Sequence, residues 1–124
     1  MVYNVCETGG EDMANAADLL RGYTDTILLK CISEGETYGY RIAKEVSAKS
    51  GGSLELKEAT LYTAFRRLEG AGLIESRWGD EAQGARRRYY SLTEAGRLRL
   101  AEDMAQWTQT KAVLSSLLEE DGNE

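Results

Sequence analysis

Residues 57–96 read KEATLYTAFRRLEGAGLIESRWGDEAQGARRRYYSLTEAG, and the spacing of apolar residues in this stretch changes along its length. Leu61, Phe65 and Leu68 lie four and three residues apart, which places them on one face of a helix. The Gly-Ala-Gly sequence at 70–72 ends that helix, because glycine readily adopts the left-handed conformation of a C-terminal cap. The stretch therefore begins with an amphipathic helix whose outer face is polar.

Two strands and the start of another helix follow. Residues 73–78 and 86–92 are predicted to be strands, joined by a turn over 79–85 that contains two glycines. Thr93 has the side chain to cap a further helix beginning at Glu94. A helix, a two-stranded ribbon and a new helix, in this order, predict a winged helix-turn-helix.

The preceding residues supply the other helices of this fold. A first helix is predicted from Asn15 or Asp18 to about Ser33, and a second from Tyr38 to near Ser50. The second helix would brace the helix after it, whose exposed face would enter the major groove of DNA.

The C-terminal helix carries a second pattern. Its apolar seam has spacings of four and three residues, typical of a coiled coil. The seam consists of Leu100, Met104, Trp107, Lys111, Leu114 and Leu118. We expect a homodimer held by Leu100, Met104, Trp107, Leu114 and Leu118, because a helix over 94–120 outreaches so small a domain. The alternative is that this helix packs back on its own domain. The fold class is thus α+β and mostly α: a winged helix-turn-helix with a long C-terminal dimerisation helix.

Composition narrows the possible functions. The chain has 124 residues, no histidine and two cysteines, so a zinc site or a histidine-based catalytic group lacks its usual side chains. We expect no metal, no cofactor and no enzymatic activity. With no apolar run long enough to span a membrane and no signal peptide, the chain is expected to be cytoplasmic.

Acidic residues are concentrated at the two ends of the chain. The net charge is −6, yet residues 54–97 contain eight Lys or Arg and seven Asp or Glu. We therefore divide the chain into a disordered acidic leader (1–17), a DNA-binding domain (18–93) and a dimerisation helix (94–120). DNA binding by such a chain should be strongly sensitive to salt.

Residues on the outer face of the helix and on the ribbon are the candidates for DNA contact. Arginine can pair with guanine edges, and threonine can contact a base or a thymine methyl. The candidates are Lys57, Thr60, Thr63, Arg66 and Arg67 on the helix, and Gln83, Gly84, Arg86 and Arg88 on the ribbon. Because side chains alternate along a strand, Arg87 should face away from Arg86 and Arg88. The alternative for the helix is a solvated face on which Arg66 or Arg67 pairs with Glu69 or Glu58. The alternative for the ribbon is that its arginines pair with Asp80, Glu81 and Glu75 within the hairpin, where exposed ion pairs contribute little.

The stretch ATLYTAFRRLEGAGLIESRWGDEAQGARRRYYSLTEAG, together with a tryptophan midway along the last helix, resembles the PadR family of transcriptional repressors. The likeness covers about residues 20–118, and is greatest to the multidrug-sensing, LmrR-like branch. Many family members have proline after the tyrosine of the recognition helix, whereas here Thr63 follows Tyr62, as in that branch. The resemblance implies that the Tyr62 hydroxyl contacts a DNA phosphate.

The resemblance also implies a ligand site. In the multidrug-sensing branch, a tryptophan at the place of Trp107 and its two-fold mate flank a pore in which planar aromatic compounds stack. Spacing alone favours a core role for Trp107 instead. The implied lining residues are Trp107, Met104, Lys111, Leu19, Tyr23 and Thr26. Branch members that favour cationic drugs can have an acid at position 111, so Lys111 admits neutral or anionic ligands.

These patterns predict a homodimeric repressor that binds a palindromic operator and responds to a planar aromatic effector. The alternative is a winged-helix module that binds another protein and has no sequence-specific DNA binding.

Overall fold

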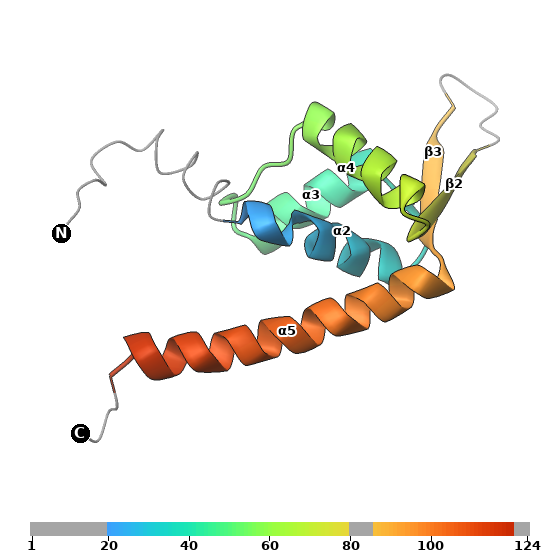
Figure 1. The fold of residues 1–124 in the computed structure, drawn as a ribbon. Helices are drawn as coiled ribbons and strands as arrows, with labels where there is room; N and C mark the ends of the chain where they lie inside the picture. Colours follow the sequence, from blue (N-terminus) through green and yellow to red (C-terminus); the bar gives the residue numbers. More distant parts are fainter. Residues whose placement is uncertain (1–19, 80–85, 121–124) are drawn as a thin grey trace.

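The computed structural model describes residues 20–79 and 86–120, and Figure 1 shows how their elements are arranged. The helices are η2 (Arg21–Tyr23, a 3-10 turn), α2 (Thr24–Ser33), α3 (Gly39–Lys49), α4 (Glu58–Gly70) and α5 (Glu94–Leu118). The strands are β1 (Thr37–Tyr38), β2 (Ile74–Trp78) and β3 (Arg88–Leu92). The acidic leader, Leu19, Gln83 and Gly84 lie outside the described residues. The predicted winged helix-turn-helix with a long last helix is confirmed.

The core lies where α2, α3 and α4 meet the sheet. Leu28, Ile42 and Leu68, one from each helix, are at most 1% exposed. The ring of Phe65 stacks on that of Tyr90 in β3, with centroids 4.1 Å apart. Cys31 is a free, buried thiol, and desolvation raises its pKa.

The sheet has three antiparallel strands in the order β1-β3-β2. The ribbon of β2 and β3 was predicted, with β2 starting one residue later and β3 two residues later than expected. β1 was not predicted, because a strand of two residues has no periodicity to detect. It pairs Thr37 with Tyr90 and so ties the start of α3 to the ribbon.

The first helix begins differently from the prediction. A continuous helix from residue 15 or 18 was expected, but the chain makes a 3-10 turn at Arg21–Tyr23 before α2 starts at Thr24. Gly22 lies in this turn, and glycine is about 1 kcal/mol less favourable than alanine inside an α-helix.

The junction between β3 and α5 is tightly packed. The Thr93 hydroxyl accepts a hydrogen bond from Gly96 N at 3.0 Å, which confirms the predicted cap. The same hydroxyl donates to the carbonyl of Gly72 at 2.7 Å. Gly96 is buried, and a Cβ atom there would lie 2.0 Å from the carbonyl oxygen of Leu73. Glycine at 96 therefore allows the first turn of α5 to lie directly against Leu73, in the segment between α4 and β2.

Helix α5 runs along α2 and diverges from it toward its own C-terminal end (Figure 1). Gly96 is its only buried residue in the described chain. Leu117 and Leu118 are 73% and 76% exposed. Among the described residues, no helix is both long and apolar enough to cross a membrane.

Candidate nucleic-acid interface

Helix α4 presents a polar face to solvent. Its apolar side chains, Leu61, Ala64, Phe65 and Leu68, are buried against the core. The candidate DNA residues Lys57, Thr60, Tyr62, Thr63, Arg66 and Arg67 are all exposed. The structure thus separates the two faces as the spacing predicted, and leaves all six candidates accessible.

Arg67 forms an ion pair with an acidic side chain. Its guanidinium donates to a carboxylate oxygen of Asp25 in α2. The alternative partners named from the sequence were Glu58 and Glu69 on the same helix, but the observed partner lies 42 residues away. By contrast, Arg66 has no ion-pair or hydrogen-bond partner within residues 20–79 and 86–120.

The three consecutive arginines of the wing point to two sides, as predicted. Arg86 and Arg88 both lie over the ring of Trp78, at 5.0 and 4.9 Å from its centroid. Arg87 lies over the ring of Tyr38, at 4.4 Å. Arg86 and Arg88 therefore share one face of the ribbon, where both guanidinium groups lie over the half-exposed Trp78 ring.

Acidic partners limit the positive charge of the wing. Arg88 is 4.0 Å from Glu69, which also accepts from the Ser76 hydroxyl. Arg77 binds Glu36 through two hydrogen bonds of 2.7 and 2.8 Å, and this contact lowers the pKa of the Glu36 carboxyl. The acids predicted to pair with the wing arginines were Glu75, Asp80 and Glu81, whereas Arg88 pairs with Glu69. Asp80 and Glu81 lie outside the described residues. The pairs are largely exposed and contribute little to stability.

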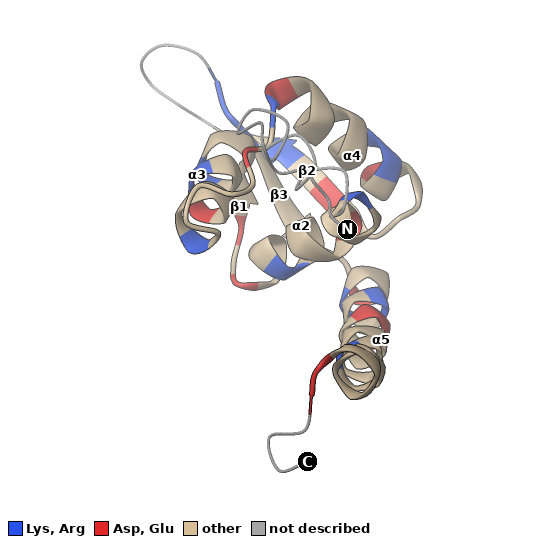
Figure 2. Cartoon of the chain, turned by 90° about the vertical axis from the view of Figure 1, so that its left-hand side faces the viewer, with Lys and Arg blue, Asp and Glu red and all other residues tan. Residues whose placement is uncertain are grey.

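A hollow of about 470 Å³ lies between α3, α4 and the wing. Aromatic side chains dominate its lining, including those of Tyr38, Tyr40, Tyr62 and Trp78, and the three wing arginines border it. The hollow lies in the angle between α4 and the ribbon of β2 and β3. Figure 2 shows Lys and Arg on α3, on α4 and on the part of the wing next to its grey trace, with Asp and Glu among them, and acid directly after the C-terminal end of α5. The basic side chains thus occur where the chain would approach DNA.

The described residues of the implied ligand site lie in η2, α2 and α5, and Leu19 lies outside the described residues. Trp107 packs edge-on against Tyr23 with ring centroids 5.8 Å apart, and the Lys111 ammonium lies 5.8 Å from the Trp107 centroid. The Thr26 hydroxyl donates to Asp103 at 2.8 Å. Trp107 is 38% exposed in the single chain, so it is neither a core residue nor enclosed in a pocket by its own chain.

Three residues near the interface were not named as DNA contacts from the sequence. Trp78 and Tyr40 are 50% and 69% exposed. Large aromatic side chains that are exposed beside arginines indicate a candidate binding surface. The position of Trp78 before Gly79 at the end of a predicted strand could have indicated its contact with Arg86 and Arg88. Asp25 offers no such signal, because its contact with Arg67 depends on how α2 packs against α4.

The fold and the exposed face of α4 define a class: DNA-binding winged helix-turn-helix proteins. Residues 28–102 match the Transcriptional regulator PadR-like family, and the chain belongs to this family. Regulators of this family bind DNA and are typically dimeric, and they are not enzymes.

Individual proteins show the same relationship. An uncharacterised protein, protein X, of Lysinibacillus sphaericus is 39% identical over 103 residues, which are 83% of this chain and 94% of the relative. A transcriptional regulator from Clostridium thermocellum has a similar structure, with 40% identity and a TM-score of 0.75, covering 82% of this chain and 99% of that one. A PadR family regulator from Eggerthella lenta has 30% identity and a TM-score of 0.75, covering 87% and 92%. The chain therefore spans nearly the whole length of these relatives.

Proposed function

We propose that the protein is a transcriptional repressor that binds a palindromic operator as a homodimer. The observation that carries this proposal is the exposed polar face of α4, flanked by a ribbon on which Arg86 and Arg88 share one side. Threonine and arginine on such a face can contact base edges, while lysine, tyrosine and the wing can contact phosphates.

Helix α5 supplies the surface for a second chain. Met104, Trp107, Leu114 and Leu118 of the seam are 37%, 38%, 46% and 76% exposed in one chain. Only Leu100 of the seam packs partly against its own core. A second copy of α5 would cover the exposed side chains, and the resulting two-fold axis would present two recognition helices to a palindromic site.

An aromatic effector would bind at the dimer interface near Trp107. Tyr23 of η2 and Lys111 on the next turn of α5 contact the Trp107 ring. Met104 lies one turn before Trp107 on α5, Thr26 lies in α2, and Leu19 completes the candidate set. The resemblance to the multidrug-sensing branch supports this site, and Lys111 favours neutral or anionic aromatic compounds. A ligand that binds more tightly to the DNA-incompetent form of the dimer would release the operator.

Fluorescence anisotropy of labelled duplexes tests DNA binding. A duplex from upstream of this gene and a scrambled duplex of the same composition are titrated over a range of salt. We expect tighter binding to the upstream duplex, which weakens as salt rises. The Arg66→Gln chain should lose part of that preference, because arginine discriminates bases by about 1–3 kcal/mol when it reads them. Equal, weak binding to both duplexes at every salt concentration would favour the protein-interaction module instead, whose arginines serve only the ion pairs described above.

Tryptophan fluorescence tests the effector site. The chain has two tryptophans, so the Trp78→Phe chain leaves Trp107 as the only reporter. Planar aromatic compounds of negative, zero and positive charge should quench it, with anionic and neutral compounds binding more tightly. Lys111→Glu should reverse this order of charge preference. Trp107→Ala, followed through the release of labelled DNA at protein concentrations where the duplex is still bound, should reduce the response to ligand; a full response from this chain would contradict the site.

A further inference from the structure

A second hollow, of about 330 Å³, lies between the outer face of α4 and the start of α2. Arg21 and Arg67 line it together with the threonines Thr24, Thr60 and Thr63. Guanidinium groups and hydroxyls are the side-chain donors that phosphate oxygens accept from. Among the described residues that line this hollow, none is acidic. Its chemistry therefore fits a phosphate group on the strand whose groove α4 would enter.

Arg67, at the edge of this hollow, is already engaged. One oxygen of the Asp25 carboxylate accepts from its guanidinium, and the side chains of the two residues are 52% and 24% exposed. Such an exposed pair is weak, whereas an arginine can bind a phosphate with two parallel hydrogen bonds. A phosphate in the hollow would therefore compete with Asp25 for the same guanidinium.

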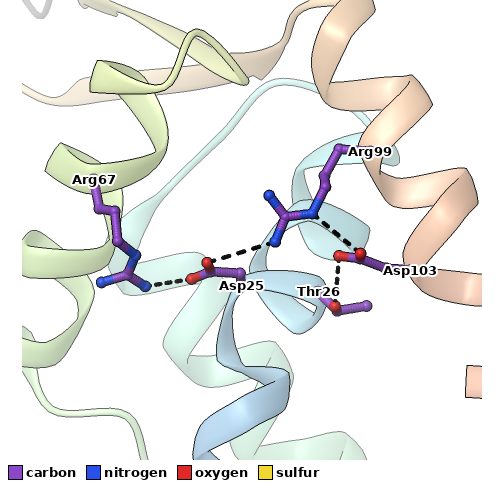
Figure 3. A network of polar contacts seen from close by, with 5 residues as sticks. All are labelled: Asp25, Thr26, Arg67, Arg99 and Asp103. Carbon is purple, nitrogen blue, oxygen red and sulfur yellow. Dashed lines mark hydrogen bonds and ion pairs between the residues drawn. The ribbon is translucent and has the colours of Figure 1, made fainter. Parts of the chain in front are cut away.

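The other oxygen of Asp25 faces α5. It lies 3.9 Å from Nη2 of Arg99, whose Nε donates to Asp103 at 3.1 Å. Asp103 in turn accepts from the Thr26 hydroxyl of α2 at 2.8 Å. Figure 3 shows these side chains as one row that crosses from α4 over α2 to α5. Asp25 is thus shared by two arginines, one on the DNA side and one on the helix proposed to form the dimer.

We propose that this hollow seats a DNA backbone phosphate and that Asp25 sets DNA affinity by competing with this phosphate for Arg67. The proposal rests on the proposed DNA-binding function and adds a residue that opposes it. Because Arg99 draws on the same carboxylate, the position of α5 sets how strongly Asp25 holds Arg67. If α5 moves so that Arg99 comes closer to Asp25, the contact between Asp25 and Arg67 weakens and Arg67 can bind the DNA phosphate. If α5 moves so that Arg99 is farther from Asp25, the contact between Asp25 and Arg67 strengthens and Arg67 is less available to DNA. The row of charges therefore connects the dimer helix with the recognition helix.

The first test is Asp25→Asn in the full chain, measured on the upstream and scrambled duplexes described above. Removing the competing charge should tighten binding about two- to fivefold at low salt, the factor that corresponds to one exposed ion pair. The slope of log affinity against log salt should steepen by about 0.9 for each chain bound, because one more phosphate is neutralised. Both duplexes should gain equally, since a phosphate contact carries no sequence information.

Two comparisons separate this effect from a change in net charge. Glu34→Gln removes the same charge at the other end of α2, where Glu34 pairs with Lys30 at 3.7 Å, and should leave the salt slope unchanged. In a chain that already carries Arg67→Gln, Asp25→Asn should have no effect, because the guanidinium it would release is missing.

The link to α5 is tested by Asp103→Asn, with Glu102→Gln as the matched change at the exposed neighbouring position. Freed from Asp103, Arg99 should pair more closely with Asp25, so DNA binding should tighten beyond the effect of Glu102→Gln. This excess should disappear in the Arg67→Gln background. Circular dichroism of each chain confirms that it is folded.

Several results would overturn the proposal. Asp25→Asn that weakens binding, or that matches Glu34→Gln, would show that Asp25 does not compete with DNA. If Asp25→Asn raised the affinity for the upstream duplex alone, Arg67 would contact a base, and the hollow would not bind a phosphate. If the wild type bound DNA and the variants bound it with the same affinity and salt slope, this inference alone would be contradicted. If no chain bound DNA, the proposed function and this inference would both be contradicted.

Discussion

Individual side chains on the DNA-facing side differ in how they are held. Arg66 projects from the outer face of α4, Arg67 is paired with Asp25, and Arg88 lies between Trp78 and Glu69. Three arginines that look equivalent in the sequence thus have different availability for DNA. The difference arises from acidic residues on other elements, which local sequence patterns do not reveal.

Thr37 in β1 provides a prediction about stability. Its side chain is buried, and its hydroxyl has no hydrogen-bond partner in the described part of the chain. Burying a hydroxyl without a partner is unfavourable, and valine has nearly the same shape without the polar group. Thr37→Val should therefore raise the free energy of unfolding by about 1 kcal/mol. Urea titration followed by circular dichroism measures this change, and a lower midpoint would mean that the hydroxyl has a partner in solution.

Glu36 provides a prediction about pH. Its contact with Arg77 lowers the carboxyl pKa from the ordinary value of 4.5, so the folded chain holds the charged form more strongly than the unfolded chain does. This contribution to stability is present above that ordinary value and is lost as the pH falls through the lowered one. The Glu36→Gln chain should lose less stability on acidification than the wild type. Melting temperatures from neutral to acidic pH test this, with Glu75→Gln, an exposed position in the strand that carries Arg77, as the control.

At the scale of elements, the junction of β3 with α5 determines how the last helix leaves the domain. Gly96→Ala would place a Cβ atom 2.0 Å from the carbonyl oxygen of Leu73, so α5 would have to move. We expect a loss of about 1–3 kcal/mol or more in unfolding free energy, as in other overpacked sites.

Gly70 at the end of α4 is the matched control for that substitution. A Cβ atom there would meet nothing within 4 Å. Gly70→Ala should be neutral or stabilising by up to about 1 kcal/mol, because alanine is the better helix former. Equal effects of the two substitutions in thermal unfolding would contradict the assigned role of Gly96.

The elements differ in how far the sequence predicts them. Helix α4, the ribbon and the cap at Thr93 follow from local spacing and from residue chemistry, and the structure confirms them. The alternation of Arg86 to Arg88 was predicted for the same reason. β1 and the 3-10 turn before α2 were missed, because short segments obtain their conformation from tertiary pairing. The ion pairs of Asp25 and Glu36 join residues about 40 positions apart, and no local pattern encodes such contacts. The DNA contacts and the effector site remain predictions.

At the scale of the whole molecule, the exposed part of α5 predicts association. Leu114 and Leu118 lie four residues apart on the proposed seam and are 46% and 76% exposed. Replacing both with glutamine should shift the protein from dimer to monomer, since the loss of apolar burial removes the main driving force for pairing. Sedimentation equilibrium measures the shift.

Leu98 is the control for the seam. It is 64% exposed and lies two positions before Leu100, on roughly the opposite face of the helix. Leu98→Gln should leave the association constant unchanged. If it dissociated the dimer as strongly as the double substitution, a face of α5 other than the seam would form the contact.

Helix α5, with a single buried residue in its own chain, also affects how the cell can use such a regulator. When two chains are needed to occupy one operator, the amount of active species varies with the square of the chain concentration as long as monomers predominate. Halving the supply of protein in that range lowers the dimer about fourfold. The expression level of the protein would then itself control how much operator is occupied. Modest dilution of the protein during growth would relieve repression without any effector.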